Sequence, residues 1–188
     1  MRWLARSLGA AALVLVFSLL MSACSQIPRD SEGTADRVAG GTLRVGVLDY
    51  APWAETDPGP GNTSAGTSST TGNGAPAGEP TGPEPDLVRG FAEELGADVE
   101  WVTGSESELV PRLEDGQIDL LVGGLDAKTP YKQKLGLTRA YLTTVDAEGN
   151  TMKHVMAVKN GENAFLVDLE TYLSTTDIPV PEGVEVKR

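Results

Sequence analysis

Three strand-like segments that alternate with two helix-like segments constrain the fold of this 188-residue chain more than any other feature. Residues 42–48 alternate apolar and polar side chains, and residues 98–102 place Val99 and Trp101 on one face. Residues 118–122 form an apolar run after Asp119, which is typical of a strand buried on both faces. The pattern predicts three strands of one sheet.

The two segments between these strands have the periodicity of helices. The first begins at Pro85, carries apolar residues on one face, and ends at Gly96. The second begins at Ser105 or Ser107 and ends at Gly116, and its Pro111 is expected in or near the first turn. Because parallel crossovers are right-handed, the order predicts an α/β fold with a βαβαβ core.

The C-terminal part predicts additional strands and a helix. Residues 137–145 and 152–159 are expected to be extended, on either side of a polar turn at 146–150. Residues 162–174 carry apolar side chains at spacings of three and four, which predicts a helix packed on the core. Residues 177–188 are expected to form a loose tail.

A biased segment at residues 56–83 separates the first strand from the rest. Apart from Asp57 and Glu79, it contains only Gly, Ser, Thr, Pro, Ala and Asn. Such a composition buries too little apolar surface to offset the entropy of ordering, so we expect a disordered insert. A single strand cannot form a domain, which predicts one lobe over residues 42–176, interrupted by this insert.

The N-terminus has the pattern of a secretory signal peptide. Two arginines precede an uncharged apolar run over residues 8–20, which is short for a membrane span, and Cys24 follows. Residues 20–24 resemble a bacterial lipobox, which implies cleavage before Cys24 and lipid on its thiol. Residues 1–23 are then the signal peptide, and polar residues 24–41 are expected to be a tether. The alternatives are an ordinary signal peptide with a chance cysteine, and a plain membrane anchor.

The charged and metal-binding residues exclude several functional classes. The net charge is −12, which argues against a nucleic-acid partner. One His and one Cys cannot assemble a zinc or iron–sulfur site, and a disulfide needs two cysteines. We therefore expect no cofactor and no metal.

Ligands of open α/β sheets bind beyond the carboxyl ends of the strands, which here brings residues 49–53, 103–106 and 123–129 to one crevice. Candidate ligand-binding residues are Asp49, Tyr50, Trp53, Gly124, Asp126, Thr129 and Lys132.

Each of these candidates has a structural alternative. Tyr50 and Trp53 could stack on a ligand or cap the core. Asp126 and Lys132, together with Lys128, could form an ionic clamp or a solvated loop. His154 is expected to have a surface or hydrogen-bonded structural role, and the carboxylates around the second helix are expected to cap it or to be solvated.

Several stretches together resemble the bacterial family 3 solute-binding proteins, the lipoprotein receptors of polar amino-acid ABC importers. These stretches are residues 43–47 with 50–53, residues 86–101, residues 109–113 with 116–120, residues 123–125 with 129–130, Tyr141, and residues 154–172. The resemblance implies a type II periplasmic-binding-protein-like fold. Members of this family have two lobes, but here only residues 143–153 stand where the second lobe is expected, so the chain resembles a single-lobe form.

The resemblance also identifies a difference in the carboxylate clamp. Family members commonly have an Arg beyond the third strand that pairs with the ligand carboxylate. Tyr131 or Lys132 takes that place here, and neither offers the bidentate fork of Arg. Asp126 stands where a ligand-binding Thr is usual and would repel a carboxylate.

These observations predict a lipid-anchored protein on the extracytoplasmic face of a cell membrane, and not an enzyme. It would present a small polar or zwitterionic solute to a membrane transporter, or regulate that transporter. The alternative is an interaction or structural lipoprotein that has lost ligand binding. A third hypothesis, lyase-like activity on amino-acid-derived substrates, has little support in the available catalytic residues.

Overall fold

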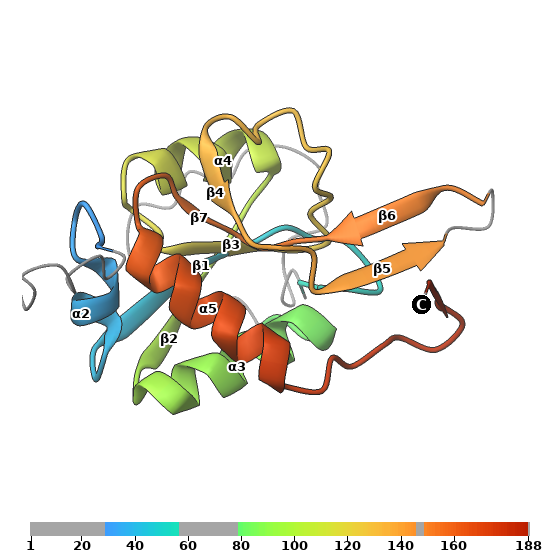
Figure 1. Cartoon of the computed structure of the whole chain (residues 1–188), viewed down its shortest axis with the longest axis horizontal. Helices are drawn as coiled ribbons and strands as arrows, with labels where there is room; N and C mark the ends of the chain where they lie inside the picture. The colour runs from blue at the N-terminus through green and yellow to red at the C-terminus, as the bar shows by residue number, and fades with distance from the viewer. Residues whose placement is uncertain (1–28, 57–78, 146–148, 188) are drawn as a thin grey trace, which may run out of the picture.

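The fold is seen in a computed structural model that describes residues 29–56, 79–145 and 149–187. Its centre is a five-stranded sheet with the order β2-β1-β3-β7-β4 (Figure 1). Strands β2 and β3 lie parallel to β1 on its two sides, whereas β7 is antiparallel to both β3 and β4. The strands are β1 (Thr42–Val47), β2 (Asp98–Thr103), β3 (Leu120–Val122), β4 (Leu135–Leu137) and β7 (Ala157–Lys159).

Three helices cover the two faces of this sheet, and Figure 1 shows α4 on one face with α3 and α5 on the other. They are α3 (Pro83–Leu95), α4 (Glu106–Glu114) and α5 (Asn163–Thr175). One apolar cluster joins α3 and α5 to the sheet through Val45, Leu120 and Val158, and a second joins α4 to Leu121 and Ala157. The predicted α/β lobe with a βαβαβ core is confirmed.

The helix ends follow the residues that the sequence singled out, with small differences. Gly96 adopts a left-handed conformation after α3, and Ser105 precedes α4 in a capping box with Glu108. Helix α3 begins at Pro83, two residues before the predicted Pro85. Pro111 lies inside α4 beyond its first turn, so its expected position was wrong. The missing proline N–H is tolerated in this nine-residue helix, which packs firmly through Leu109, Val110 and Leu113.

A second, three-stranded sheet extends from the lobe (Figure 1). Its order is β6-β5-β8, with β5 (Leu142–Val145), β6 (Thr151–His154) and β8 (Glu185–Val186) all antiparallel. The two long extended segments of the sequence prediction are therefore each divided between two sheets. The Thr138 hydroxyl accepts a hydrogen bond from the Met156 N–H at 3.0 Å where both segments cross from one sheet to the other.

The tail at residues 177–188 was expected to be loose, and for its described residues this was wrong. Strand β8 pairs with β5, and the Lys187 N–H donates to the Thr143 carbonyl at 2.9 Å. Ile178 packs against the main apolar cluster. The tail is ordered because the free edge of β5 offers unpaired backbone groups, which a local sequence pattern does not reveal.

The expectation that residues 24–41 form a tether is also partly wrong. Residues 34–38 form helix α2 (Thr34–Val38), and Val38 is fully buried against the lobe. The lobe thus begins near Asp30 and not at residue 42. Residues 1–28, which include Cys24 and the segment expected to be a signal peptide, lie outside the described residues.

The insert predicted at residues 56–83 falls mostly outside the described residues, which omit 57–78. Its last part is ordered. Glu55 and Thr81 exchange two backbone hydrogen bonds of 2.8 and 2.9 Å, and Pro83 already belongs to α3. No helix within the described ranges is long and apolar enough to cross a membrane.

Candidate functional site

A cleft of about 700 Å³ opens at the carboxyl ends of β1, β2 and β3. All three segments that the sequence assigned to this edge contribute to it, because parallel neighbouring strands end together. Its lining residues are Leu48, Asp49, Tyr50, Thr56, Thr103, Gly104, Ser105, Glu106, Glu108, Leu109, Arg112, Gly123, Gly124, Leu125, Asp126, Thr129 and Pro130.

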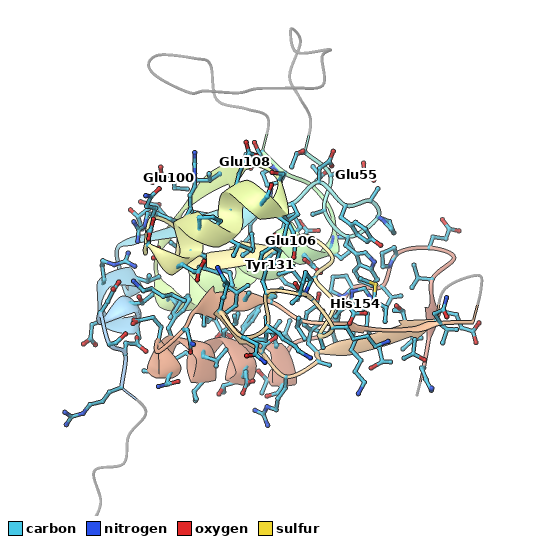
Figure 2. The ribbon with its side chains drawn as sticks, turned by 90° about the horizontal axis from the view of Figure 1, so that it is seen from above. Glu55, Glu100, Glu106, Glu108, Tyr131 and His154 are labelled. Atoms are coloured by element: carbon cyan, nitrogen blue, oxygen red, sulfur yellow. The ribbon has the colours of Figure 1, made fainter. Side chains whose placement is uncertain are left out.

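Four carboxylates line this cleft, from three different elements. Asp49 follows β1, Asp126 follows β3, and Glu106 and Glu108 occupy the first turn of α4. Figure 2 shows Glu106 beside the segment that carries Tyr131, and Glu108 further out along α4. Arg112 is the single basic side chain among the described lining residues. The cleft is therefore strongly acidic.

Each of these carboxylates also accepts a hydrogen bond that fixes a nearby loop. Asp49 accepts from the Thr56 N–H at 3.1 Å, and Asp126 from the Lys128 N–H at 2.7 Å. Glu106 accepts from the Thr129 hydroxyl at 2.9 Å, which ties α4 to the loop after β3.

Glu108 has a separate role at the start of α4. It accepts from the Ser105 N–H at 2.9 Å and from the Ser105 hydroxyl at 2.8 Å. These bonds, with a smaller contribution from the charge of Arg112, lower the pKa of Glu108. The sequence expectation that the carboxylates of α4 cap the helix or are solvated holds for Glu108. Glu106 belongs to a segment that was expected at the crevice but was not among the candidate binding residues, and Arg112 was not expected there.

A fully buried carboxylate supports the cleft from behind. Glu84, in the first turn of α3, accepts from the Gly123 N–H at 2.5 Å and the Gly124 N–H at 3.1 Å. Its other oxygen accepts from the Tyr141 hydroxyl at 2.5 Å. Burial raises the pKa of Glu84, although the three donors act in the opposite direction. This contact fixes the Gly123–Gly124 segment, and local sequence patterns gave no signal for it.

Tyr50 provides an aromatic wall. Tyr50 is 47% exposed, and a Cβ atom added at Gly124 would lie 2.2 Å from the Tyr50 ring. Gly124 also has a φ of +69°, which side-chain-bearing residues rarely adopt. Glycine is therefore required at position 124, both for the backbone turn and for the close approach of Tyr50.

Trp53, in contrast, does not line the cleft. It is 4% exposed, and its ring packs at a tilt of 41° against the ring of the fully buried His154, with centroids 4.0 Å apart. A tight turn, closed by backbone bonds between Tyr50 and Ala54, directs Trp53 back into the core. Of the two roles considered for Trp53, its burial beside His154 therefore favours capping of the core over contact with a ligand.

His154 has the structural role expected of it. Its Nε2 lies 2.8 Å from the Thr144 hydroxyl, and within the described residues its Nδ1 has no hydrogen-bond partner. Burial lowers the pKa of His154, while the charge of Asp126 opposes this shift.

The two lysines proposed for an ionic clamp do not line the cleft. Lys132 is exposed, and the Lys128 ammonium reaches the Thr151 carbonyl at 3.4 Å. Tyr131 packs against the apolar cluster beneath α4. Neither residue at the position of the family's arginine therefore faces the cleft. In the described part of the chain, no group of three His, Cys, Asp or Glu side chains is arranged to hold a metal ion.

Comparison with known proteins identifies a family for the chain. A sequence profile of the bacterial extracellular solute-binding proteins, family 3, matches residues 66–175. Comparison with curated protein sequences finds no significant match.

Three solved structures show the likeness in fold. The arginine-bound form of domain 1 from TmArgBP has a TM-score of 0.56 and 20% identity, covering 75% of this chain and 98% of that one. An ancestral cationic amino acid solute-binding protein has a TM-score of 0.58 and 16% identity, covering 75% and 92%. A periplasmic binding protein of Salmonella typhimurium with high arginine specificity has a TM-score of 0.53 and 12% identity, covering 71% and 92%.

Proposed function

The chain belongs to the bacterial extracellular solute-binding proteins, family 3, and on that premise we propose that its cleft captures a small polar solute for a membrane transporter. The observation that carries this proposal is the cleft itself. Its volume of about 700 Å³ lies in the range of small-molecule sites, and it stands at the sheet edge where α/β folds bind ligands.

A single lobe is sufficient for such a role in principle. Domain 1 of TmArgBP has a similar fold, and its crystal structure shows this domain bound to arginine. One lobe covers only part of a ligand, so the affinity depends on how well the existing wall is preorganised. The support of the Gly123–Gly124 segment by Glu84 supplies such preorganisation.

The extracytoplasmic location follows from the family, and we extend it to a lipid anchor at Cys24. The lipobox-like residues 20–24 support this extension. Two or more acyl chains give stable anchoring, and an acidic body would not bind anionic lipid by its own charge. Metabolic labelling with a fatty-acid probe should mark the wild type and not Cys24→Ala. Equal labelling of both would contradict the anchor without affecting the solute-binding role.

Solute binding is tested by a thermal-shift panel of amino acids, amines and inorganic ions on the chain without residues 1–23. A ligand at 100 times its Kd stabilises a protein by about 2.7 kcal/mol. At least one solute should raise the melting temperature, and Gly124→Ala should remove that shift, because an added Cβ would displace Tyr50.

The second candidate function is an interaction lipoprotein that has lost ligand binding. It is favoured by the absence of a basic side chain where family members bind the ligand carboxylate, since Tyr131 is packed and Lys132 lies outside the cleft. No shift with any solute in the panel would support this candidate over the transport role.

A further inference from the structure

Several hydrogen-bond donors at the cleft are already bound to carboxylates of the protein. Glu84 takes the Gly123 and Gly124 N–H groups, and Glu108 takes the Ser105 N–H. In the loop after β3, the Lys128 N–H donates to the Asp126 carboxylate. These backbone donors at the cleft wall are therefore already bound to carboxylates of the protein itself.

Two of the side-chain donors of the cleft are engaged in the same way. The Thr129 hydroxyl donates to Glu106, and the Ser105 hydroxyl donates to Glu108. Arg112 follows Glu108 by one helical turn, and its charge acts on that carboxylate. A solute carboxylate entering the cleft would find no basic group that is not already close to an acidic one.

Acceptors, by contrast, are in excess. From the described residues, Asp49, Glu106 and Asp126 each accept hydrogen bonds through one oxygen only. The second oxygen of each carboxylate has no bond from those residues. The exposed ring of Tyr50 adds an aromatic face that attracts cations.

We propose that the solute of this cleft is a small organic cation, an amine or guanidinium compound that carries no carboxylate. The inference rests on the proposed solute-binding function and names its substrate class. Ammonium and guanidinium groups supply donors for the remaining carboxylate oxygens, and they neutralise the charges of Asp49, Glu106 and Asp126. A solute carboxylate would instead meet four carboxylates of the protein against the single guanidinium of Arg112, which is unfavourable.

Matched pairs of ligands that differ only by the carboxylate test this inference. Arginine and agmatine form one pair, and lysine and cadaverine form another. Isothermal titration calorimetry on the chain without residues 1–23 should show agmatine or cadaverine binding at least about tenfold more tightly than its parent amino acid, a difference of about 1.4 kcal/mol.

The possible outcomes separate the two proposals. Equal or tighter binding of the amino acids would overturn the inference and leave the solute-binding function intact. Binding of only a neutral or acidic solute from the panel would do the same. If no solute bound at all, both the inference and the transport role would be contradicted.

A pair of charge-matched variants tests the site. Glu106→Gln removes one cleft charge, while its amide oxygen can still accept from Thr129. It should weaken binding of agmatine or cadaverine at least about tenfold, because a charged partner is lost. Glu93→Gln removes one charge from an exposed position on α3 outside the cleft and should change the affinity less than about twofold. An equal loss in both variants would show that only the overall charge matters and would refute the site.

Discussion

Asp30 caps helix α5, and Glu162, the residue just before α5, in turn caps helix α2. Asp30 accepts from the Ala164 N–H at 2.6 Å and the Phe165 N–H at 3.0 Å. Glu162 accepts from the Thr34 N–H at 3.0 Å, at the first turn of α2. The two residues also form an isolated backbone bridge. This reciprocal arrangement fastens the start of the lobe to its last helix.

Asp30→Ala should lower the free energy of unfolding by about 1–2 kcal/mol, because two N–H groups of α5 lose their acceptor. Urea denaturation at neutral pH measures the change. Asp177→Ala, at an exposed position after α5, serves as the control and should cost less than about 0.5 kcal/mol. If the two variants were equally stable, Asp30 would not act as a cap, and the first residues of the lobe could be dispensable after all.

The pairing of Asp30 with Glu162 illustrates which helices the sequence could predict and which it could not. Helices α3 and α4 were predicted because their apolar spacing and their caps, such as Ser105 and Gly96, lie within a few residues. Helix α2 was missed, because it is only five residues long and one of its two capping acceptors, Glu162, lies far along the chain, while the other is Asp30. A local sequence pattern can indicate only interactions between nearby residues. A polar, Gly-containing segment such as residues 24–41 is therefore equally consistent with a tether.

The candidate site shows the same limit. Strand order alone predicted which loops meet, because it depends on the handedness of crossovers and not on side chains. Which side chains of those loops face the cleft depends on turns and long-range bonds. Tyr50 and Trp53 are three residues apart, yet the turn between them exposes one and buries the other.

Trp53 should therefore matter for stability and Tyr50 for binding. Trp53→Ala should cost about 3–5 kcal/mol, since it empties the space beside His154. Tyr50→Ala should cost less than about 1 kcal/mol, because the residue is half exposed. Thermal and urea denaturation of both variants measure the difference. Trp53→Phe, which keeps an aromatic ring, provides a milder variant should Trp53→Ala fail to fold. A small loss in Trp53→Ala would place this side chain outside the core.

His154 should make the stability depend on pH. Burial lowers its folded-state pKa below the ordinary value of 6.5, so the unfolded chain binds the proton more readily. The stability that comes from keeping His154 neutral is then fully present above about pH 6.5. It is lost as the pH falls from there through the folded-state pKa. The chain contains a single histidine, so this imidazole contribution can be assigned without ambiguity.

The measurement is the free energy of unfolding between about pH 5 and pH 7.5, for the wild type and for His154→Gln. Glutamine can still bond to the Thr144 hydroxyl but does not titrate. The variant should lack the part of the slope near pH 6, while the slope due to carboxylates at lower pH remains in both. Parallel curves across the whole range would contradict a lowered pKa for His154.

The backbone pairing of Glu55 with Thr81 predicts how the insert can be shortened. These residues exchange two hydrogen bonds, so both ends of the intervening segment are already held side by side. Replacing residues 57–78 with two glycines should keep the circular dichroism spectrum and leave the stability unchanged or raise it by about 1–2 kcal/mol, since each halving of a loop lowers its closure cost by about 0.6 kcal/mol. A deletion extended through Thr81 removes the pairing and should be less stable than the shorter deletion. If the shorter deletion itself lost more than about 2 kcal/mol, the removed segment would have to contribute packing of its own.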